Sequence, residues 1–160
     1  MPMSEGSGSE ASGAAGSGPR ATPILLDTHV WIWVVEGSRD RLSPEAVTRI
    51  QEASGAGEVL VSAISVWEVS MLASAGRISL ARSLDDWVKA ALRAPGVRLL
   101  ELTPEIAMES TRLPEGPGGD PADRILMAGA RVTGAVLATA DRRIVSYGKR
   151  GHLAVMDVRP

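Results

Sequence analysis

The sequence predicts an α/β fold, a three-layer α/β/α sandwich around a mostly parallel central sheet. Short apolar runs of strand length alternate along the chain with longer segments of helical periodicity, as in βαβ units. The apolar runs lack a regular polar alternation, which indicates that helices cover both faces of the sheet. A length of 160 residues with 44% apolar content suits one domain with a packed core.

Residues 1–21 are expected to lie outside this domain as a disordered tail, because they are almost entirely Gly, Ser and Ala. Such a segment cannot bury enough apolar surface to offset the entropy lost on ordering. It also lacks the basic start and apolar centre of a secretory signal. The folded domain is therefore expected at residues 22–160.

The domain begins with a buried strand, TPILLD (22–27), which leads into a helix starting near Thr28. Residues 43–45, Ser-Pro-Glu, are typical of a helix start, with serine as N-cap and proline in the first turn. Gly55 ends this second helix. The apolar run EVLVSAI (58–64) is the second strand.

The central part of the chain continues the alternation. A helix is expected over 65–75, closed by Gly76, and another over 84–94, where apolar residues recur at core spacing. VRLLEL (97–102) is the third strand, and residues 104–113 form the next helix. The last expected strands are AVLATA (135–140) and LAVMDV (153–158).

Residues 120–124, Asp-Pro-Ala-Asp-Arg, start a helix expected over 121–133 and place two carboxylates one helical turn apart. Asp120 is a typical N-cap, and Asp123 lies in the positive first turn of the helix. Taken alone, stabilisation of the helix start explains both residues.

Acidic residues also stand where other elements meet the carboxyl edge of the sheet. Asp27 ends the first strand, and Asp141 ends strand 135–140. Glu68 and Asp123 lie in the expected first turns of helices that begin at this same edge. Because function in open α/β sheets gathers at the carboxyl ends of the strands, these four carboxylates are expected to converge.

Each acid also has a purely structural interpretation. Asp27 suits a cap of the helix that follows it, and Asp141 suits a turn before Arg142. Residues 65–68, Ser-Val-Trp-Glu, fit a capping box in which Glu68 bonds back to the helix start. These interpretations explain the acids one at a time but not their common edge.

A cluster of carboxylates is costly, because like charges raise one another's pKa values, and a divalent cation relieves this cost. Oxygen ligands without cysteine or a histidine pair favour Mg²⁺ or Mn²⁺ over zinc. Such an ion activates water and stabilises charge on a phosphoryl group. The spacing of the acids therefore favours a metal-dependent hydrolase acting on phosphate esters.

Composition excludes several other classes. With no cysteine, the chain has no disulfide framework, thiolate metal site or cysteine nucleophile. Its apolar stretches are shorter than the ~20 residues of a membrane-spanning helix. Seventeen basic and 19 acidic residues give a net charge of −2, so a polyanion would need a local basic patch. Arg142-Arg143 and Lys149-Arg150 are candidates, and an ordinary solvated surface explains them equally well.

Four segments, in this order, resemble the PIN-domain ribonucleases, specifically the VapC-type toxins of type II toxin–antitoxin pairs. They are ILLDTHVWIW, VSAISVWEVSMLASAGRISL, DPADRILMAGARVTG and AVLATADRRIVSYG. The resemblance runs from about Ile24 to the C-terminus. It implies a PIN-like α/β/α sandwich and maps the family's acids onto Asp27, Glu68, Asp123 and Asp141.

The resemblance also implies a mechanism, in which a metal-bound water attacks an RNA phosphodiester and leaves a 5′-phosphate and a 3′-hydroxyl. Asp27 and Asp123 would be the principal ligands of Mg²⁺ or Mn²⁺, and Glu68 and Asp141 would complete the set. Asp120, Thr28 and Thr139 would lie beside the pocket and contact the ligands rather than the metal. Packing of a β-branched side chain also explains Thr139.

The same resemblance implies a cytoplasmic protein that acts on RNA, forms a homodimer and binds a cognate antitoxin over its acidic pocket. One departure concerns the loop before residue 120, where relatives often carry a basic residue or histidine and this chain has GPGG. Two alternatives stay open. A haloacid dehalogenase-type phosphatase requires a second aspartate where this chain has His29, and a PIN fold with an idle site would act only through protein contacts.

Overall fold

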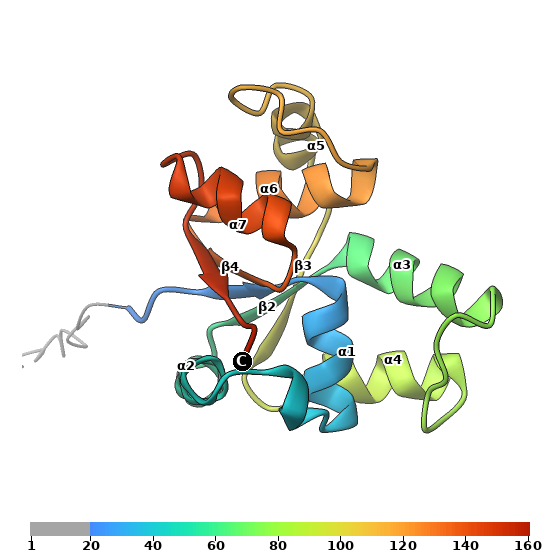
Figure 1. Cartoon of the computed structure of the whole chain (residues 1–160). Helices are drawn as coiled ribbons and strands as arrows, with labels where there is room; N and C mark the ends of the chain where they lie inside the picture. Colours follow the sequence, from blue (N-terminus) through green and yellow to red (C-terminus); the bar gives the residue numbers. More distant parts are fainter. Residues whose placement is uncertain (1–19) are drawn as a thin grey trace, which may run out of the picture.

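The computed structural model describes residues 20–160 (Figure 1). The tail expected at 1–21 lies almost wholly outside the described residues. The elements, in chain order, are β1 (Ile24–Leu26), α1 (Thr28–Glu36), the 3₁₀ turn η1 (Arg39–Arg41), α2 (Pro44–Gly55), β2 (Val59–Ser62), α3 (Ala63–Ser74), α4 (Leu84–Leu92), β3 (Val97–Leu100), α5 (Pro104–Ser110), α6 (Pro121–Thr133), β4 (Val136–Thr139), α7 (Arg142–Lys149) and β5 (Val155–Asp157).

The strands form one five-stranded sheet in the order β3-β2-β1-β4-β5, and every neighbouring pair is parallel. The chain moves outward from β1 to β2 and β3, then returns to the other side of β1 with β4. The topological switch therefore lies between β1 and β4, where Leu26 pairs with Ala138. In open α/β sheets this is the place where ligands bind.

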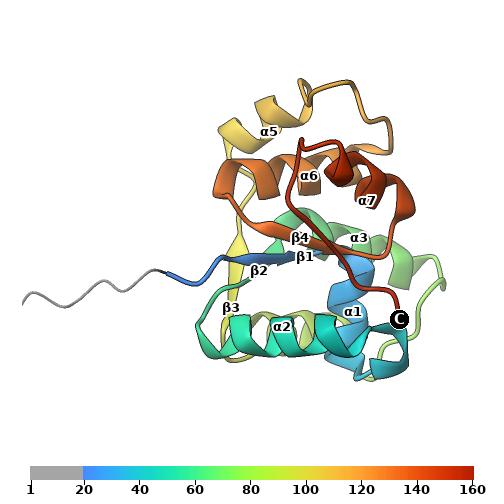
Figure 2. The same ribbon diagram turned by 60° about the vertical axis from the view of Figure 1, so that its left-hand side comes forward.

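Helices cover both faces of the sheet, which confirms the predicted three-layer sandwich. Helices α5, α6 and α7 lie on one face, and α1, α2 and α4 lie on the other (Figures 1 and 2). Alternate strand residues enter different cores: Leu25 and Leu137 pack under the first group, whereas Leu26 and Val61 pack under the second. Burial on both sides explains why the strands are continuous apolar runs.

Helix α1 contributes its large side chains unevenly to the second core. Trp31 is fully buried and packs edge-on against Trp87 of α4, with ring centroids 4.9 Å apart. Trp33, two positions later, points to a different side of the helix and is half-buried, with the Arg41 guanidinium 5.8 Å from its ring centroid. One side of α1 therefore packs in the core through Trp31, and the side that carries Trp33 is partly exposed.

One expected helix start was wrong, and one helix was not predicted. Helix α3 begins at Ala63 rather than Ser65, with Ser62 as the N-cap that accepts the Ile64 N–H over 3.2 Å. Residues 142–149, for which the sequence pattern predicts no element, form helix α7. Within residues 20–160, no helix is long and apolar enough to cross a membrane.

Candidate active site

Asp27 follows β1 and stays within the sheet through its main chain, because its N–H donates to the Ala138 carbonyl over 3.0 Å. It is the N-cap residue of α1, but its side chain makes no capping bond. Instead Oδ2 accepts a hydrogen bond from Thr139 Oγ1 at 2.5 Å. The interpretation of Asp27 as a helix-capping side chain is therefore wrong.

Thr139, the last residue of β4, is fully buried and connects two of the acids. Its hydroxyl donates to Asp27 and accepts the main-chain N–H of Asp141 over 3.0 Å. Packing alone therefore does not account for this threonine. One hydroxyl fixes the carboxylate after β1 and the start of the segment after β4.

Glu68 lies in the second turn of α3, because this helix begins two residues earlier than expected. Its Oε1 accepts a hydrogen bond from Thr28 Oγ1 at 2.6 Å, and Thr28 also bonds Ser65 Oγ at 2.9 Å. Ser65 and Thr28 are both buried. The capping-box interpretation is wrong: Ser65 and Glu68 bond across to α1 rather than to the start of their own helix.

Asp120 and Asp123 divide their roles at the start of α6. Asp120 is the N-cap, and its Oδ1 accepts the Asp123 N–H over 2.9 Å, as predicted. The Asp123 carboxylate is 18% exposed. A Cβ added to Gly119, whose φ is +88°, would lie 3.2 Å from Asp123 Oδ2. The glycine loop therefore approaches the carboxylate closely.

Arg143 belongs to one of the two candidate basic patches, and in the structure it binds directly to the acids. Its guanidinium donates to Asp123 Oδ2 over 3.2 Å and to Asp141 Oδ2 over 3.1 Å. Asp141 is the N-cap of α7, where its Oδ1 accepts the Arg143 N–H over 2.7 Å. The sequence signal for these contacts is an arginine two residues after an aspartate that caps a helix. It can be recognised only when helix α7 is known, because otherwise Asp141 is not identified as a cap.

Three of the four acids have pKa values above the ordinary range. Burial is the main cause for Asp27, whose pKa is raised despite the bond from Thr139. Burial also raises the pKa of Glu68, and the negative charge of Asp27 adds to the rise. For Asp123, burial and the neighbouring aspartates together raise the pKa to about 6. The charges of these acids therefore act on one another.

Asp141 behaves in the opposite way. Burial alone would raise its pKa, but the hydrogen bonds and positive charge of Arg143 outweigh burial and lower the pKa below the ordinary value. The arginine thus neutralises the more exposed side of the acidic site.

The donor set fits a hard divalent cation by its chemistry, since it consists of carboxylate oxygens whose mutual repulsion a divalent charge would relieve. In the part of the chain that the structure describes, however, no group of three or more such side chains is arranged to hold a metal ion. Hydroxyls and Arg143 hold the carboxylates instead. Metal binding at this edge would require these side chains to exchange partners.

A family model of the PIN domain matches residues 24–150, which span every acid of this site. The chain belongs to the PIN-domain family. It is 39% identical over 126 residues to Ribonuclease VapC22 of Mycobacterium tuberculosis, a match that covers 79% of this chain and 92% of that protein. The resemblance inferred from the four sequence segments is thus confirmed.

Solved structures share this PIN fold at low sequence identity. VapBC2 from Rickettsia felis, bound to a DNA fragment from its promoter, matches with a TM-score of 0.61 and 11% identity over 83% of this chain and 96% of that chain. DNA-bound VapBC from Salmonella typhimurium matches with a TM-score of 0.59 and 15% identity, over 85% of this chain and 98% of that chain. FitAcB from Neisseria gonorrhoeae matches with a TM-score of 0.55 and 21% identity, over 83% of this chain and 96% of that chain.

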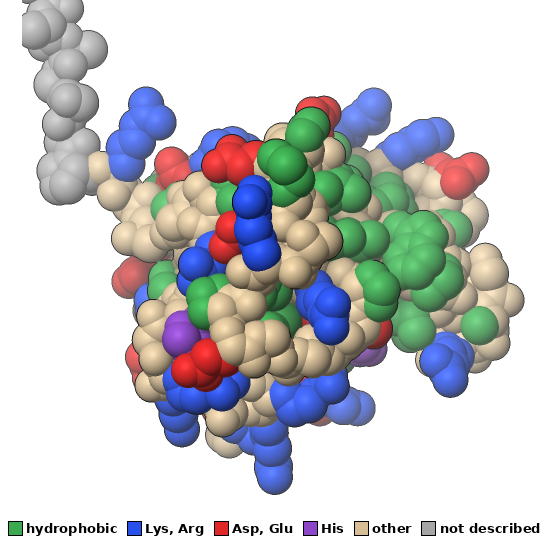
Figure 3. Space-filling view, turned by 90° about the horizontal axis from the view of Figure 1, so that it is seen from above, with side chains coloured by type: hydrophobic (Ala, Val, Ile, Leu, Met, Phe, Trp, Pro, Cys, Tyr) green, Lys and Arg blue, Asp and Glu red, His purple; other side chains and the backbone are tan. Residues whose placement is uncertain are grey.

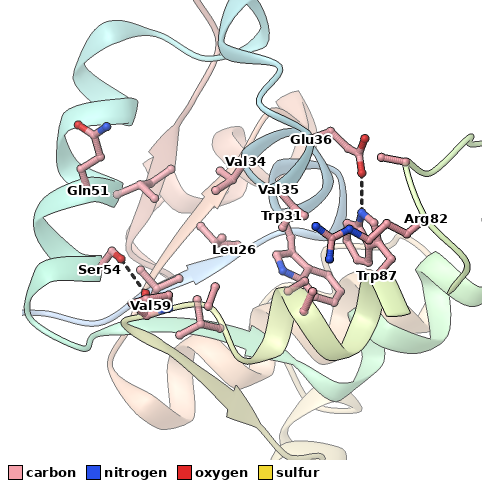
Figure 4. Close-up of a pocket in the computed structure, with 17 residues that line it drawn as sticks. Leu26, Trp31, Val34, Val35, Glu36, Gln51, Ser54, Val59, Arg82 and Trp87 are labelled. Atoms are coloured by element: carbon pink, nitrogen blue, oxygen red, sulfur yellow. Dashed lines mark hydrogen bonds between the residues drawn. The ribbon is translucent and has the colours of Figure 1, made fainter. Parts of the chain in front are cut away.

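The best-formed hollow among the described residues of this PIN domain lies away from the acidic edge and contains none of the four acids. It is a cavity of about 470 Å³ between α1, α2 and α4, and its lining is mostly apolar. Figure 4 shows Trp31 and Trp87 at one end of it, with Gln51 and Ser54 of α2 at the other. Trp87 Nε1 donates to Glu36 at the rim over 2.5 Å. This lining suits apolar side chains rather than phosphate groups.

Helix α3 carries an exposed apolar surface on this PIN domain. Trp67 is 52% exposed and Met71 is 48% exposed, one helical turn apart. Figure 3 shows hydrophobic side chains gathered over α3, on the right of the face seen from above. Large apolar side chains grouped in this way are typical of protein contacts.

Proposed function

We propose that this PIN-domain protein is a metal-dependent endoribonuclease that acts as the toxin of a toxin–antitoxin pair. The observation that carries the proposal is the acidic edge at the switch point of a parallel sheet, where, in addition to burial, the charge of Asp27 raises the pKa of Glu68 and the charges of Asp27 and Asp141 raise the pKa of Asp123. The 39% identity to a protein named as a ribonuclease supports the same activity. The family assignment removes the ground for the haloacid dehalogenase-type alternative.

Within this proposal, Asp27 and Asp123 are the principal ligands of Mg²⁺ or Mn²⁺, and Glu68 and Asp141 complete the set. Such an ion, when bound, supplies an activated water and stabilises charge that develops on the phosphoryl group. The four acids offer only oxygen donors, which favours these ions over softer metals.

The side chains around the acids have positioning roles. Thr139 holds the Asp27 carboxylate from the buried side, and Thr28 does the same for Glu68. The hydrogen bond from Thr28 fixes one oxygen of Glu68 and thereby orients its carboxylate to accept a proton. We propose that Glu68 accepts the proton of the attacking water. Cleavage of the RNA phosphodiester would then leave a 5′-phosphate and a 3′-hydroxyl.

Cleavage of a labelled structured RNA tests this function directly. Purified protein with Mg²⁺ should cut the RNA, whereas EDTA, Asp27→Asn and Asp123→Asn should each reduce the rate by two orders of magnitude or more, as expected for a lost metal ligand. Glu52→Gln, an exposed acid on α2, is the matched control and should retain the rate. Intact RNA under all conditions, with tight binding to a partner, would instead favour the idle PIN fold.

The proposed partners follow from the same family. Several structural neighbours are complexes named VapBC. We assign this chain an antitoxin that covers the acidic edge and whose apolar side chains also fill the cavity between α1, α2 and α4. We also propose a homodimer through the exposed surface of Trp67 and Met71, and action in the cytoplasm. Co-purification of a small protein, lost on Ala90→Arg at the cavity wall while RNA cleavage is retained, would support the assigned antitoxin surface.

A further inference from the structure

Arg143 joins two acids that come from different elements. It is the second residue of α7, and its guanidinium reaches back over its own helix start to Asp141 and across to Asp123 of α6. Each contact ends on the Oδ2 atom, at 3.1 Å and 3.2 Å respectively. The Asp141 Oδ1 atom is occupied by the Arg143 N–H. One residue therefore holds both oxygens of Asp141 and one oxygen of Asp123.

The guanidinium is the mobile partner in this cluster. The Arg143 side chain is 65% exposed, whereas the side chains of Asp123 and Asp141 are 18% and 28% exposed. Ion pairs with one solvated partner stabilise little, because water and salt screen them and the long side chain loses freedom. Arg143 is therefore the partner that can leave this cluster for solvent.

A divalent cation held by the carboxylates of Asp123 and Asp141 would compete with Arg143 for them. Two cations in contact with the same pair of carboxylates repel each other strongly in a partly desolvated site. Arg143 and the metal are therefore expected to exclude each other from this pair.

We propose that Arg143 is an internal counter-cation, which holds Asp123 and Asp141 until a metal displaces it and which then turns to the phosphates of the substrate. This inference rests on the metal-dependent function proposed above. A planar guanidinium with several N–H donors suits both partners, since it binds carboxylate pairs and phosphate oxygens alike. The tether to α7 keeps it at the edge of the site after release.

Calorimetric titration of the full chain with Mg²⁺ tests the exchange without reference to cleavage. Arg143→Gln should bind Mg²⁺ roughly fivefold more tightly, the change expected from removing two exposed ion pairs that compete with it. Arg142→Gln is the matched control, because Arg142 is the exposed neighbour on α7 and forms no ion pair among the described residues. Its Mg²⁺ affinity should stay within twofold of the unchanged chain.

RNA cleavage gives a second readout, in which the Mg²⁺ requirement and the affinity for RNA should change in opposite directions. Arg143→Gln should lower the Mg²⁺ concentration for half-maximal rate but raise the KM for RNA, whereas a merely structural role would impair both. Unchanged or weaker Mg²⁺ binding in Arg143→Gln, or equal tightening in both variants, overturns the inference and leaves the nuclease intact. Absence of Mg²⁺ and Mn²⁺ binding in every variant overturns the metal site and the inference together.

Discussion

Thr139 Oγ1 lies 2.5 Å from Asp27 Oδ2, so the end of β4 holds the carboxylate that follows β1. These residues are 112 positions apart in the chain, and the parallel pairing of β1 with β4 brings them together. The same hydroxyl accepts the Asp141 N–H. The central strands and the acidic site are therefore stabilised by one buried group.

Replacement of Thr139 by valine should destabilise the fold. The change keeps the shape but removes the donor to a buried carboxylate and the acceptor of a main-chain N–H, which costs about 1–3 kcal/mol in the free energy of unfolding. Urea denaturation measures this loss. Thr139→Ser retains the hydroxyl and should recover most of it. A valine variant as stable as the unchanged chain would mean that water replaces the hydroxyl.

The stability of the metal-free protein should fall as pH rises from about 4 to about 6. Burial and neighbouring charges raise the pKa of Asp123 from 3.8 to about 6, so the folded state binds more protons than the unfolded state in this window. Because stability falls with pH wherever the native state holds the extra proton, ionisation of Asp123 destabilises the fold. Thermal unfolding in EDTA across this range measures the slope.

Asp123→Asn should flatten that slope, since asparagine does not ionise. Asp141 contributes with the opposite sign, because its lowered pKa favours the folded state as pH rises through the ordinary aspartate range. A slope unaffected by Asp123→Asn would assign the pH dependence to Asp27 or Glu68 instead.

Gly119 and Gly118 offer a matched pair of substitutions next to Asp123. Both have positive φ, +88° and +71°, so alanine at either position strains the backbone by about 1–2 kcal/mol. Only at Gly119 does the added Cβ crowd the Asp123 carboxylate, whereas nothing lies within 4 Å at Gly118. Both variants should lose thermal stability, and only Gly119→Ala should also lose Mg²⁺ affinity. Equal Mg²⁺ affinity in the two would show that the carboxylate moves freely.

Asp120 should act as a helix cap and not as a ligand. Asp120→Asn preserves the acceptor for the Asp123 N–H and should change stability by a few tenths of a kcal/mol, whereas Asp120→Ala should cost about 1 kcal/mol. RNA cleavage should persist in both. If Asp120→Asn abolished cleavage as fully as Asp123→Asn, then Asp120 would be the metal ligand.

The oligomeric state should depend on α3. Trp67→Ser with Met71→Ser should shift the protein from dimer to monomer in light scattering, because both side chains are exposed, apolar and one turn apart. Met108→Ser is the control, since Met108 on α5 is also 52% exposed but lies on another helix. A chain that is already monomeric, or a dimer that persists in the double variant, would contradict the proposed interface.

The three α/β/α layers and the position of Asp27 at the carboxyl edge of the sheet could be predicted from the sequence alone. Both depend on the alternation of strands and helices along the chain. Apolar runs bounded by glycine and proline predicted the parallel strands, and an acid directly after β1 was placed correctly without side-chain geometry. The cap by Asp120 was also predictable, since it depends only on residues within one turn.

The missed features depend on contacts between distant segments. Ser65 resembles a helix start, but Ser62 takes that role because β2 ends there and Ser65 is drawn to Thr28, 37 positions away. Helix α7 was missed because it is short and rich in charge, and its apolar residues, such as Ile144 and Tyr147, are buried only against the first core. Without α7, the contacts of Arg143 were not predictable.

The uniform direction of the strands also separates the two ends of the described chain. Residues 20–23 enter the sheet at the amino end of β1, whereas β5 leaves it at the edge of the acids, where the Val158 N–H donates to the Thr139 carbonyl. An affinity tag or fluorescent reporter fused before β1 should leave RNA access untouched. The same fusion after residue 160 would stand at the edge of the acids and should slow the cleavage of long substrates.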